Sequence, residues 1–190
     1  MSRKELFMKI MIASDLHGDA DCVRALLNAY KKSEAQELVL LGDILYHGPR
    51  NDLPHGYRPK EVIELLSKMK RPPICVRGNC DAEVDQMVLP FTILAEYAHF
   101  VWDGVRIFAT HGHHHNPENL PPMLKKGDVF LYGHTHLYEA RRDKKGVLLL
   151  NPGSISLPKG GNEKTYMIYE DHRFSIMTLE GGDTIATRSV

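Results

Sequence analysis

The sequence predicts an α/β fold in which two packed β-sheets form the core and helices lie outside. Apolar runs alternate with amphipathic segments in the first half of the chain, which is typical of parallel β-α-β units. Short apolar runs separated by turn residues fill the second half, which is typical of a sheet with few helices. A length of 190 residues suits a single domain, residues 1–190, with one substantial core.

The first half is expected to form a β-α-β-α-β unit. Strands are predicted at residues 8–14, 37–43 and 72–79, and helices at residues 21–33 and 58–69. Both helices place apolar residues on one face, and Pro59 lies near the first turn of the second, where proline is favoured. Such a unit favours a mainly parallel sheet with right-handed crossovers.

The second half is expected to form an antiparallel-leaning sheet that packs on the first. Its predicted strands are residues 105–112, 128–134, 137–143, 146–153, 165–171 and 174–181. The polar stretch 47–58 is too long for a plain connection between a strand and a helix, so we expect a loop over the functional site.

Charge and composition exclude several function classes. Lys and Arg together number 24, as do Asp and Glu, so no net field draws the whole protein to nucleic acid or to an anionic membrane. The opening residues are interpreted as a first strand rather than a signal peptide, and no apolar run is long enough to span a bilayer. Three cysteines without a CxxC pair indicate a reducing compartment, so we predict a cytoplasmic protein.

Polar side chains follow the predicted strands at the points where those strands end. Because the carboxyl ends of strands in an open α/β sheet meet at one edge, these side chains are expected to lie together. They carry carboxylate, amide and imidazole groups, which are metal ligands. The candidates are Asp15, His17, Asp43, Asn79, His111, His134 and His136.

These residues belong to short motifs that occur in the order DxH, GD, GN, H and GHxH. This series of motifs is similar to the signature of the calcineurin-like metallophosphoesterases. A closer resemblance is to the small microbial YfcE-type phosphodiesterase branch of that superfamily. It is carried by the segments RGNCD, THGH, YGHTH and NPGSISLPKGG. The resemblance spans residues 15–136. It implies the metallophosphoesterase fold, a four-layer αββα sandwich of two mixed sheets flanked by helices.

The resemblance also implies a dinuclear metal centre. It places Asp15, His17, Asp43 and His136 on one ion, and Asp43, Asn79, His111 and His134 on the other. A hydroxide bridging two divalent ions would hydrolyse a small phosphodiester substrate. The family favours Mn²⁺, while Ni²⁺, Zn²⁺, Fe²⁺ or Mg²⁺ also suit ligands without thiolate.

The candidate catalytic residues are Asn79, Cys80 and His113. Many members of the superfamily carry a histidine acid where Cys80 stands, so its absence here favours substrates with good leaving groups. His113 is a candidate to replace the missing acid. In the long loop, Arg50 and Asn51 are candidates to contact the substrate phosphate.

Other polar residues near these motifs have structural interpretations. His114 and His115 match no family role and are expected on a solvated surface, whereas Asp81 is expected to orient the loop around Asn79. The segment 151–154 is either a simple Asn-Pro turn or a part of the site.

Two alternative functions stay open at this point. The first is a non-catalytic protein-binding scaffold, because a retromer subunit with this role resembles this fold. The second is a hydrolase of nucleotides or dinucleoside polyphosphates within the same superfamily. All seven candidate ligands are present, which favours catalysis over the scaffold. A homo-oligomer formed through a C-terminal edge strand is a further hypothesis.

Overall fold

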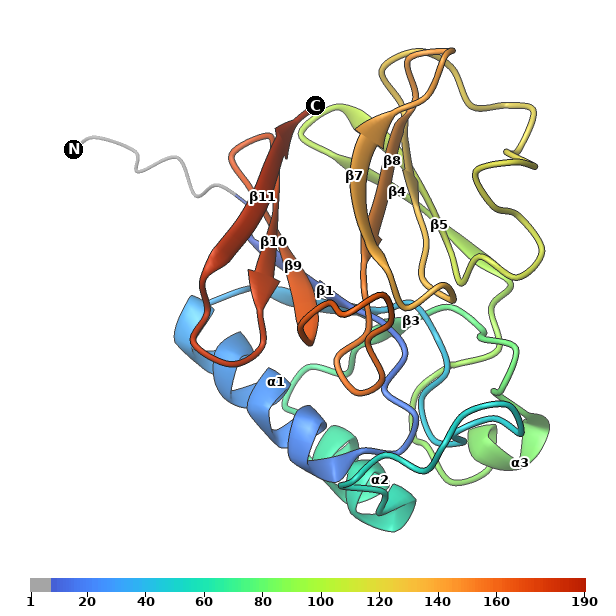
Figure 1. Ribbon diagram of the computed structural model, residues 1–190, viewed down its shortest axis with the longest axis vertical. Coiled ribbons are helices and arrows are strands. Elements are labelled where there is room, and N and C mark those ends of the chain that lie inside the picture. The colour runs from blue at the N-terminus through green and yellow to red at the C-terminus, as the bar shows by residue number, and fades with distance from the viewer. Residues whose placement is uncertain (1–7) are drawn as a thin grey trace.

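A computed structural model describes residues 8–190 and shows two β-sheets packed face to face. Helices lie on the outer side of one sheet, and the loops that leave the strands gather below the two sheets (Figure 1). The predicted α/β sandwich of two packed sheets is therefore confirmed.

The first sheet has six strands in the order β11-β10-β9-β1-β2-β3. Strands β1 (Ile10–Ala13), β2 (Glu37–Leu40) and β3 (Ile74–Cys75) are parallel, as the β-α-β-α-β pattern predicts. Strands β9 (Thr165–Glu170), β10 (Arg173–Thr178) and β11 (Thr184–Ser189) extend this sheet in antiparallel fashion beyond β1. The prediction that residues 165–181 belong to the second sheet was wrong, because β9 pairs with β1 instead.

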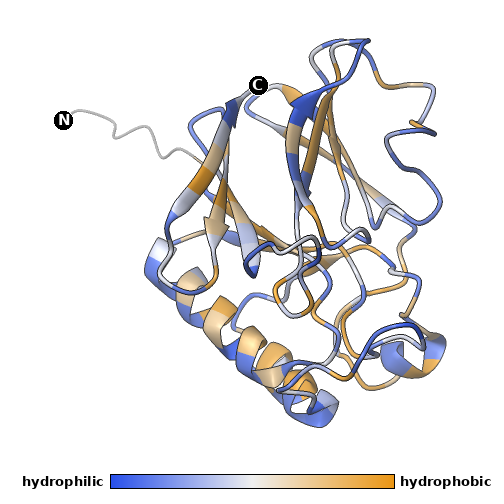
Figure 2. Ribbon diagram, in the orientation of Figure 1, coloured by the Kyte–Doolittle hydropathy of each residue, from blue (hydrophilic) through white to orange (hydrophobic). Residues whose placement is uncertain are grey.

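Two amphipathic helices cover the outer face of this sheet. Helices α1 (Ala20–Ser33) and α2 (Pro59–Ser67) bury the apolar side chains Val23, Leu26 and Val62 against Met11 and Leu38. Their outward faces are hydrophilic (Figure 2). A short third helix, α3 (Glu83–Gln86), follows β3.

The second sheet has five strands in the order β4-β5-β6-β8-β7. Strands β5 (Val105–Thr110), β6 (Val129–Leu131) and β8 (Leu148–Pro152) are parallel to one another, and β4 (Tyr97–Trp102) and β7 (Tyr138–Arg142) pair with them in antiparallel fashion. The sheet is thus mixed, with a parallel centre rather than the antiparallel bias expected from the sequence.

The core lies between the two sheets because side chains alternate along each strand. Ile10, Val39, Ile107 and Leu131 point into the space between the sheets and are buried. The opposite face of the second sheet is also apolar and is covered by the segment 112–127, with Leu120 and Leu124 against three strand residues, Phe108, Phe130 and Leu149. In the described part of the chain this outer layer is coil rather than helix.

The structure adds elements that the sequence pattern did not predict, namely β4, α3 and β11. Strand β11 is an edge of the first sheet, and the homo-oligomer suggested for such an edge stays a prediction. None of the helices within residues 8–190 has the length and apolar character needed to cross a membrane.

Candidate metal centre

The seven predicted ligands lie together at one end of the two sheets, in loops that follow five different strands. Asp15 and His17 follow β1, Asp43 follows β2 and Asn79 follows β3, so the first sheet supplies four of them. The second sheet supplies the histidines that follow β5 and β6, which are His111, His134 and His136. The parallel strands of both sheets therefore direct their carboxyl ends to one place, as expected for ligand sites of α/β proteins.

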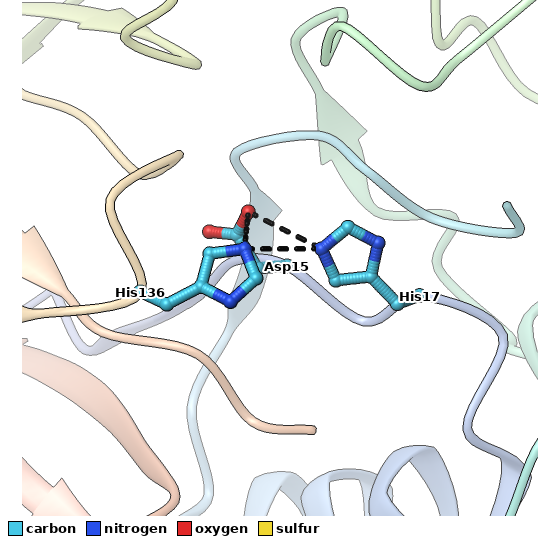
Figure 3. Close-up of side chains that lie close together, drawn as sticks. All are labelled: Asp15, His17 and His136. Atoms are coloured by element: carbon cyan, nitrogen blue, oxygen red, sulfur yellow. Dashed lines mark hydrogen bonds and ion pairs between the residues drawn. The ribbon is translucent and has the colours of Figure 1, made fainter. Parts of the chain in front are cut away.

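One group of ligands consists of Asp15, His17 and His136. Asp15 Oδ1 lies 3.3 Å from His136 Nε2 and 3.7 Å from His17 Nε2, and the two imidazole nitrogens are 3.2 Å apart (Figure 3). Ligand atoms about 2.1 Å from one ion are separated by about 3 Å, so this spacing fits a metal ion. Asp15 Oδ1 is buried and accepts no hydrogen bond of good geometry from any described residue, which also fits an oxygen that faces a cation.

The second group surrounds His111. Its Nε2 lies 3.0 Å from Asn79 Oδ1, 3.2 Å from His134 Nδ1 and 3.4 Å from Asp43 Oδ2. Amide oxygen, imidazole nitrogen and carboxylate oxygen all converge on one point at ligand spacing.

Asp43 lies between the two groups. The same carboxylate oxygen, Oδ2, is 3.4 Å from Nε2 of His111 and 3.7 Å from Nε2 of His17. A carboxylate in this position can contact two ions at once, which is the bridging role that the family resemblance implies for this residue.

Three of the histidines are fixed in one tautomer by the protein backbone. The Nδ1 atoms of His17, His111 and His136 lie 2.9, 2.7 and 2.6 Å from the carbonyl oxygens of residues 46, 41 and 157. A carbonyl can only accept, so each Nδ1 donates and each neutral ring presents an Nε2 lone pair to the centre. Two lone pairs that face each other at 3.2 Å repel unless a proton or a cation lies between them.

The charges of the metal-free centre shift the pKa values of its members. Burial disfavours a charged Asp15, but the adjacent imidazoles of His136 and His17 hold the pKa of its carboxyl well below the usual value. Burial also opposes a charged His111, but Asp43 and Asp15 raise its pKa to about 9. Burial also disfavours a charged Asp43, but the adjacent His111 lowers the pKa of its carboxyl. Both carboxylates are therefore ionised at neutral pH.

Several ligand residues occupy an uncommon backbone conformation. Asp15, His17, Asp43, His134 and His136 all have positive φ, between 47° and 65°. Non-glycine residues in this region cost about 1–3 kcal/mol each and cluster at functional sites. These turns direct the side chains to one point. Contacts with the surrounding residues must offset the conformational free energy that the turns cost.

Asp81 provides one set of these contacts. Its carboxylate accepts hydrogen bonds from the backbone N–H groups of Asp43 (2.9 Å), Ile44 (2.8 Å) and Gly78 (2.7 Å). It therefore orients the loops after β2 and β3, including the one that carries Asn79, as the sequence suggested. Gly78 is required here because a Cβ at this position would lie 2.1 Å from Oδ1 of Asp43.

The segment 151–156 provides another set. Ser154 Oγ and Ser156 Oγ each donate a hydrogen bond of 2.8 Å to the carbonyl oxygen of Asp15, and Asn151 Nδ2 donates to the carbonyl oxygen of Gly133 at 2.8 Å. Of the two interpretations left open, the structure favours a part of the site over a simple turn. Ser156 was not predicted, although it belongs to the quoted NPGSISLPKGG motif.

A cavity of about 460 Å³ opens above the ligands. Arg50 and Asn51, the predicted substrate contacts, line it together with Cys80, and the expected loop over the site is confirmed. Thr135 and Lys159 also line it and were not predicted. The backbone N–H of Cys80 donates to Oδ1 of Asp43 at 2.8 Å.

The three histidines after Gly112 have different environments. The ring of His113 lies 5.4 Å from that of His111, and burial together with the charge of His111 lowers its pKa to about 4. His114 is exposed, as expected. The expectation for His115 was wrong: its ring is half-buried and packs edge-on against Phe108, because its segment covers the second sheet.

Comparison with known proteins identifies the family. Residues 8–173 match the calcineurin-like phosphoesterase superfamily domain. The chain belongs to the calcineurin-like phosphoesterase superfamily. Phosphodiesterase YfcE of Escherichia coli strain K12 is 46% identical to this phosphoesterase over 179 residues, which cover 94% of this chain and 96% of the relative. The resemblance to the YfcE-type branch is thereby confirmed.

Solved structures show the same relationship. The structure of YfcE, described as a phosphoesterase from E. coli, superimposes on this phosphoesterase with a TM-score of 0.92 and 45% identity, covering 96% of this chain and 100% of that one. Wild-type Vps29 of Entamoeba histolytica, solved with Zn²⁺, gives a TM-score of 0.61 at 18% identity, covering 96% and 98% of the two chains. This second likeness extends to the fold alone.

Proposed function

We propose that the protein is a dinuclear metal-dependent phosphodiesterase. The observation that carries this proposal is the position of Asp43 Oδ2 between two groups of imidazole, carboxylate and amide ligands. Membership of the phosphoesterase superfamily and 46% identity to a phosphodiesterase support hydrolysis of phosphate esters. The substrate is a small phosphodiester, which fits a cavity of about 460 Å³.

The ligand set indicates which metals suit the site. Asp15, His17, Asp43 and His136 would hold one ion, and Asp43, Asn79, His111 and His134 the other. Nitrogen and oxygen ligands without thiolate suit Mn²⁺, and equally Fe²⁺, Ni²⁺ or Zn²⁺. When bound, two such ions polarise the phosphoryl group and generate a hydroxide nucleophile near neutral pH.

The residues around the cavity bind and orient the substrate. Arg50 and Lys159 bring positive charge to its walls, and this charge attracts the phosphate of the substrate. Asn51 donates through Nδ2 to the carbonyl oxygen of His47 at 2.8 Å, which holds the loop 47–58 in place over the cavity. These roles make phosphate binding depend on the loop as well as on the metal ligands.

The position of Cys80 limits the choice of leaving group. Its side chain lines the cavity beside the ligands, where a histidine would be able to protonate a departing oxygen. A neutral thiol is a weaker acid than imidazolium, so the departing group receives little help. We therefore assign a preference for acidic leaving groups, such as aryl phosphodiesters, over alkyl phosphomonoesters.

A panel of substrates tests the proposed function. Metal-free protein is reloaded with Mn²⁺, Ni²⁺, Zn²⁺ or Mg²⁺ and assayed on bis-p-nitrophenyl phosphate and on glycerol phosphate. We expect metal-dependent activity that strongly favours the aryl diester. Absence of activity with every metal would reject the proposed phosphodiesterase activity. Comparable rates on the two substrates would reject the proposed preference for acidic leaving groups.

The variant Cys80→His tests the reason for the preference. A positioned general acid contributes roughly 10²- to 10⁴-fold, mostly with poor leaving groups. We expect this variant to raise the rate on an alkyl phosphodiester by about tenfold or more while the aryl diester changes little. Cys80→Ser is the matched control because a serine hydroxyl has a similar size and is not a useful acid.

A further inference from the structure

Two histidines that follow β5 form a cluster with a glutamate that precedes β4, and the proposed function does not use this cluster. Glu96 precedes β4, and the pairing of Tyr97 with Thr110 brings it next to the residues that follow β5. Thr110 Oγ1 also donates to the carbonyl oxygen of Glu96 at 3.2 Å. The topology of the β4-β5 hairpin therefore places Glu96 beside His113 and His114.

The side chains of these three residues face one another. Each offers one ligand atom, and the three atoms all lie within 4.8 Å of one another. The rings of His113 and His114 have centroids 4.0 Å apart, and His114 Nε2 lies 3.9 Å from Glu96 Oε2. The other oxygen of Glu96, Oε1, lies 3.6 Å from Arg77 Nη1, which orients the carboxylate with Oε2 toward His114.

One ring nitrogen of this cluster lacks a hydrogen-bond partner within residues 8–190. His113 Nδ1 is shielded from solvent and makes no hydrogen bond to any described residue. A shielded polar nitrogen without a partner is costly, and a bound ion relieves that cost. The cluster thus combines three potential metal-binding side chains at close spacing with a histidine, His113, that has an unpaired ring nitrogen.

We propose that Glu96, His113 and His114 form a third divalent-metal site, separate from the seven ligands of the dinuclear centre. Two imidazoles and one carboxylate suit Zn²⁺, Co²⁺ or Ni²⁺, with water completing the coordination. Glu96 and His114 are exposed, so ions exchange readily with solvent. The site has three protein ligands and no bridging carboxylate, and it binds Zn²⁺ more weakly than the dinuclear centre.

Equilibrium dialysis of the metal-stripped full-length protein against rising free Zn²⁺ tests this site. We expect wild-type protein to bind one equivalent more than either His114→Ala or Glu96→Gln. His172→Asn is the control, because it removes a histidine from the turn between β9 and β10, far along the chain, and should leave the number of equivalents unchanged. Equal binding by wild type and His114→Ala, or a loss in only one of the two variants, would overturn the proposal.

The same measurement in an Asp43→Asn background separates this inference from the proposed function. The third site does not include Asp43, so adding His114→Ala should still remove one equivalent there. If the wild type and His114→Ala, both with Asp43 intact, each bind two ions, the dinuclear centre stands and the third site is rejected. If the central ions are absent and the one-equivalent difference persists, the third site stands without the dinuclear centre. Circular dichroism of each variant verifies that the fold is unchanged.

Discussion

Asp43 lies between the two halves of the candidate metal centre, with one oxygen close to both. Its Oδ2 atom faces His17 on one side and His111 on the other, and its Oδ1 atom accepts from the backbone of Cys80. Its left-handed backbone is held by Asp81, which binds the N–H of Asp43 itself. The orientation of this carboxylate is therefore set by neighbours that do not contact the ions.

The substitution Asp43→Asn should abolish metal-dependent hydrolysis. It keeps the size of the side chain but removes the negative charge that both ions share, so at least one ion is expected to be lost. Activity on an aryl phosphodiester and metal content per chain are the measurements. Asp52→Asn in the exposed part of the loop is a control that should leave both unchanged. Retained activity in Asp43→Asn would place the chemistry elsewhere.

Metal binding should also depend on pH through His111. Burial opposes its charged form, yet Asp43 and Asp15 raise its pKa to about 9, so the metal-free protein holds a proton on this ring at pH 7. A metal ion must displace that proton, and its apparent affinity therefore rises with pH, by up to about tenfold per unit, until pH 9. Calorimetric titration with Mn²⁺ from pH 6 to 9 checks this expectation. A flat affinity across that range would contradict it.

The ligands of the site could be predicted from the sequence, but the residues that position them could not. Ligands such as Asp15 and His136 belong to short motifs at strand ends, where a local pattern is informative. Ser156 donates to the carbonyl oxygen of Asp15 across 141 residues of sequence. No local pattern specifies such a partner, because it depends on how the two sheets pack.

At the scale of elements, helix α1 links the fold to the site. It begins just after the loop that carries Asp15 and His17, and Asp19 caps it by accepting from the backbone N–H of Cys22 at 3.0 Å. The cap satisfies an N–H group at the start of the helix and fixes the direction in which the chain leaves the metal loop.

Asp19→Ala should lower the free energy of unfolding by about 1 kcal/mol, the usual cost of losing a cap. Urea denaturation of wild type and variant at one fixed metal concentration measures the difference. Asp19→Asn is the matched control, because asparagine is an equally good capping residue, and it should lie close to wild type. A loss of the same size in both variants would assign the effect to charge rather than to capping.

Elements with strong local patterns could be predicted, and elements at sheet edges could not. The strands of the parallel centre are continuous apolar runs, and both long helices have clear apolar faces. Strand β4 exposes Tyr97 and Val101, and β11 consists largely of exposed or half-buried polar residues, so neither has a strong signal. Which sheet receives β9 depends on long-range pairing with β1, which local periodicity does not encode.

At the scale of the whole molecule, the ligands come from both sheets. Asp15, His17, Asp43 and Asn79 follow strands of the first, and His111, His134 and His136 follow strands of the second. Ions bound at the proposed centre would therefore connect the two layers at one end, in addition to the apolar core between them. We expect metal binding and the stability of the sandwich to be coupled for this reason.

Removal of metal should lower the melting temperature. A ligand present at 100 times its dissociation constant stabilises a protein by about 2.7 kcal/mol, which corresponds to roughly 5–10 °C for a chain of this size. Differential scanning calorimetry with Mn²⁺ and with a chelator measures the shift. Asp43→Asn should show a smaller shift, and an identical melting temperature for wild type in both conditions would contradict the coupling.

The division of the ligands between two layers has a consequence for metal preference. The spacing between the two proposed ions would be set by how closely the layers approach. This approach depends on buried aliphatic side chains such as Val39, Leu131 and Leu150. Trimming or enlarging these side chains shifts the layers, since protein interiors are close-packed. A laboratory selection for a smaller or larger ion should therefore recover substitutions in the hydrocarbon interior, well away from every coordinating atom.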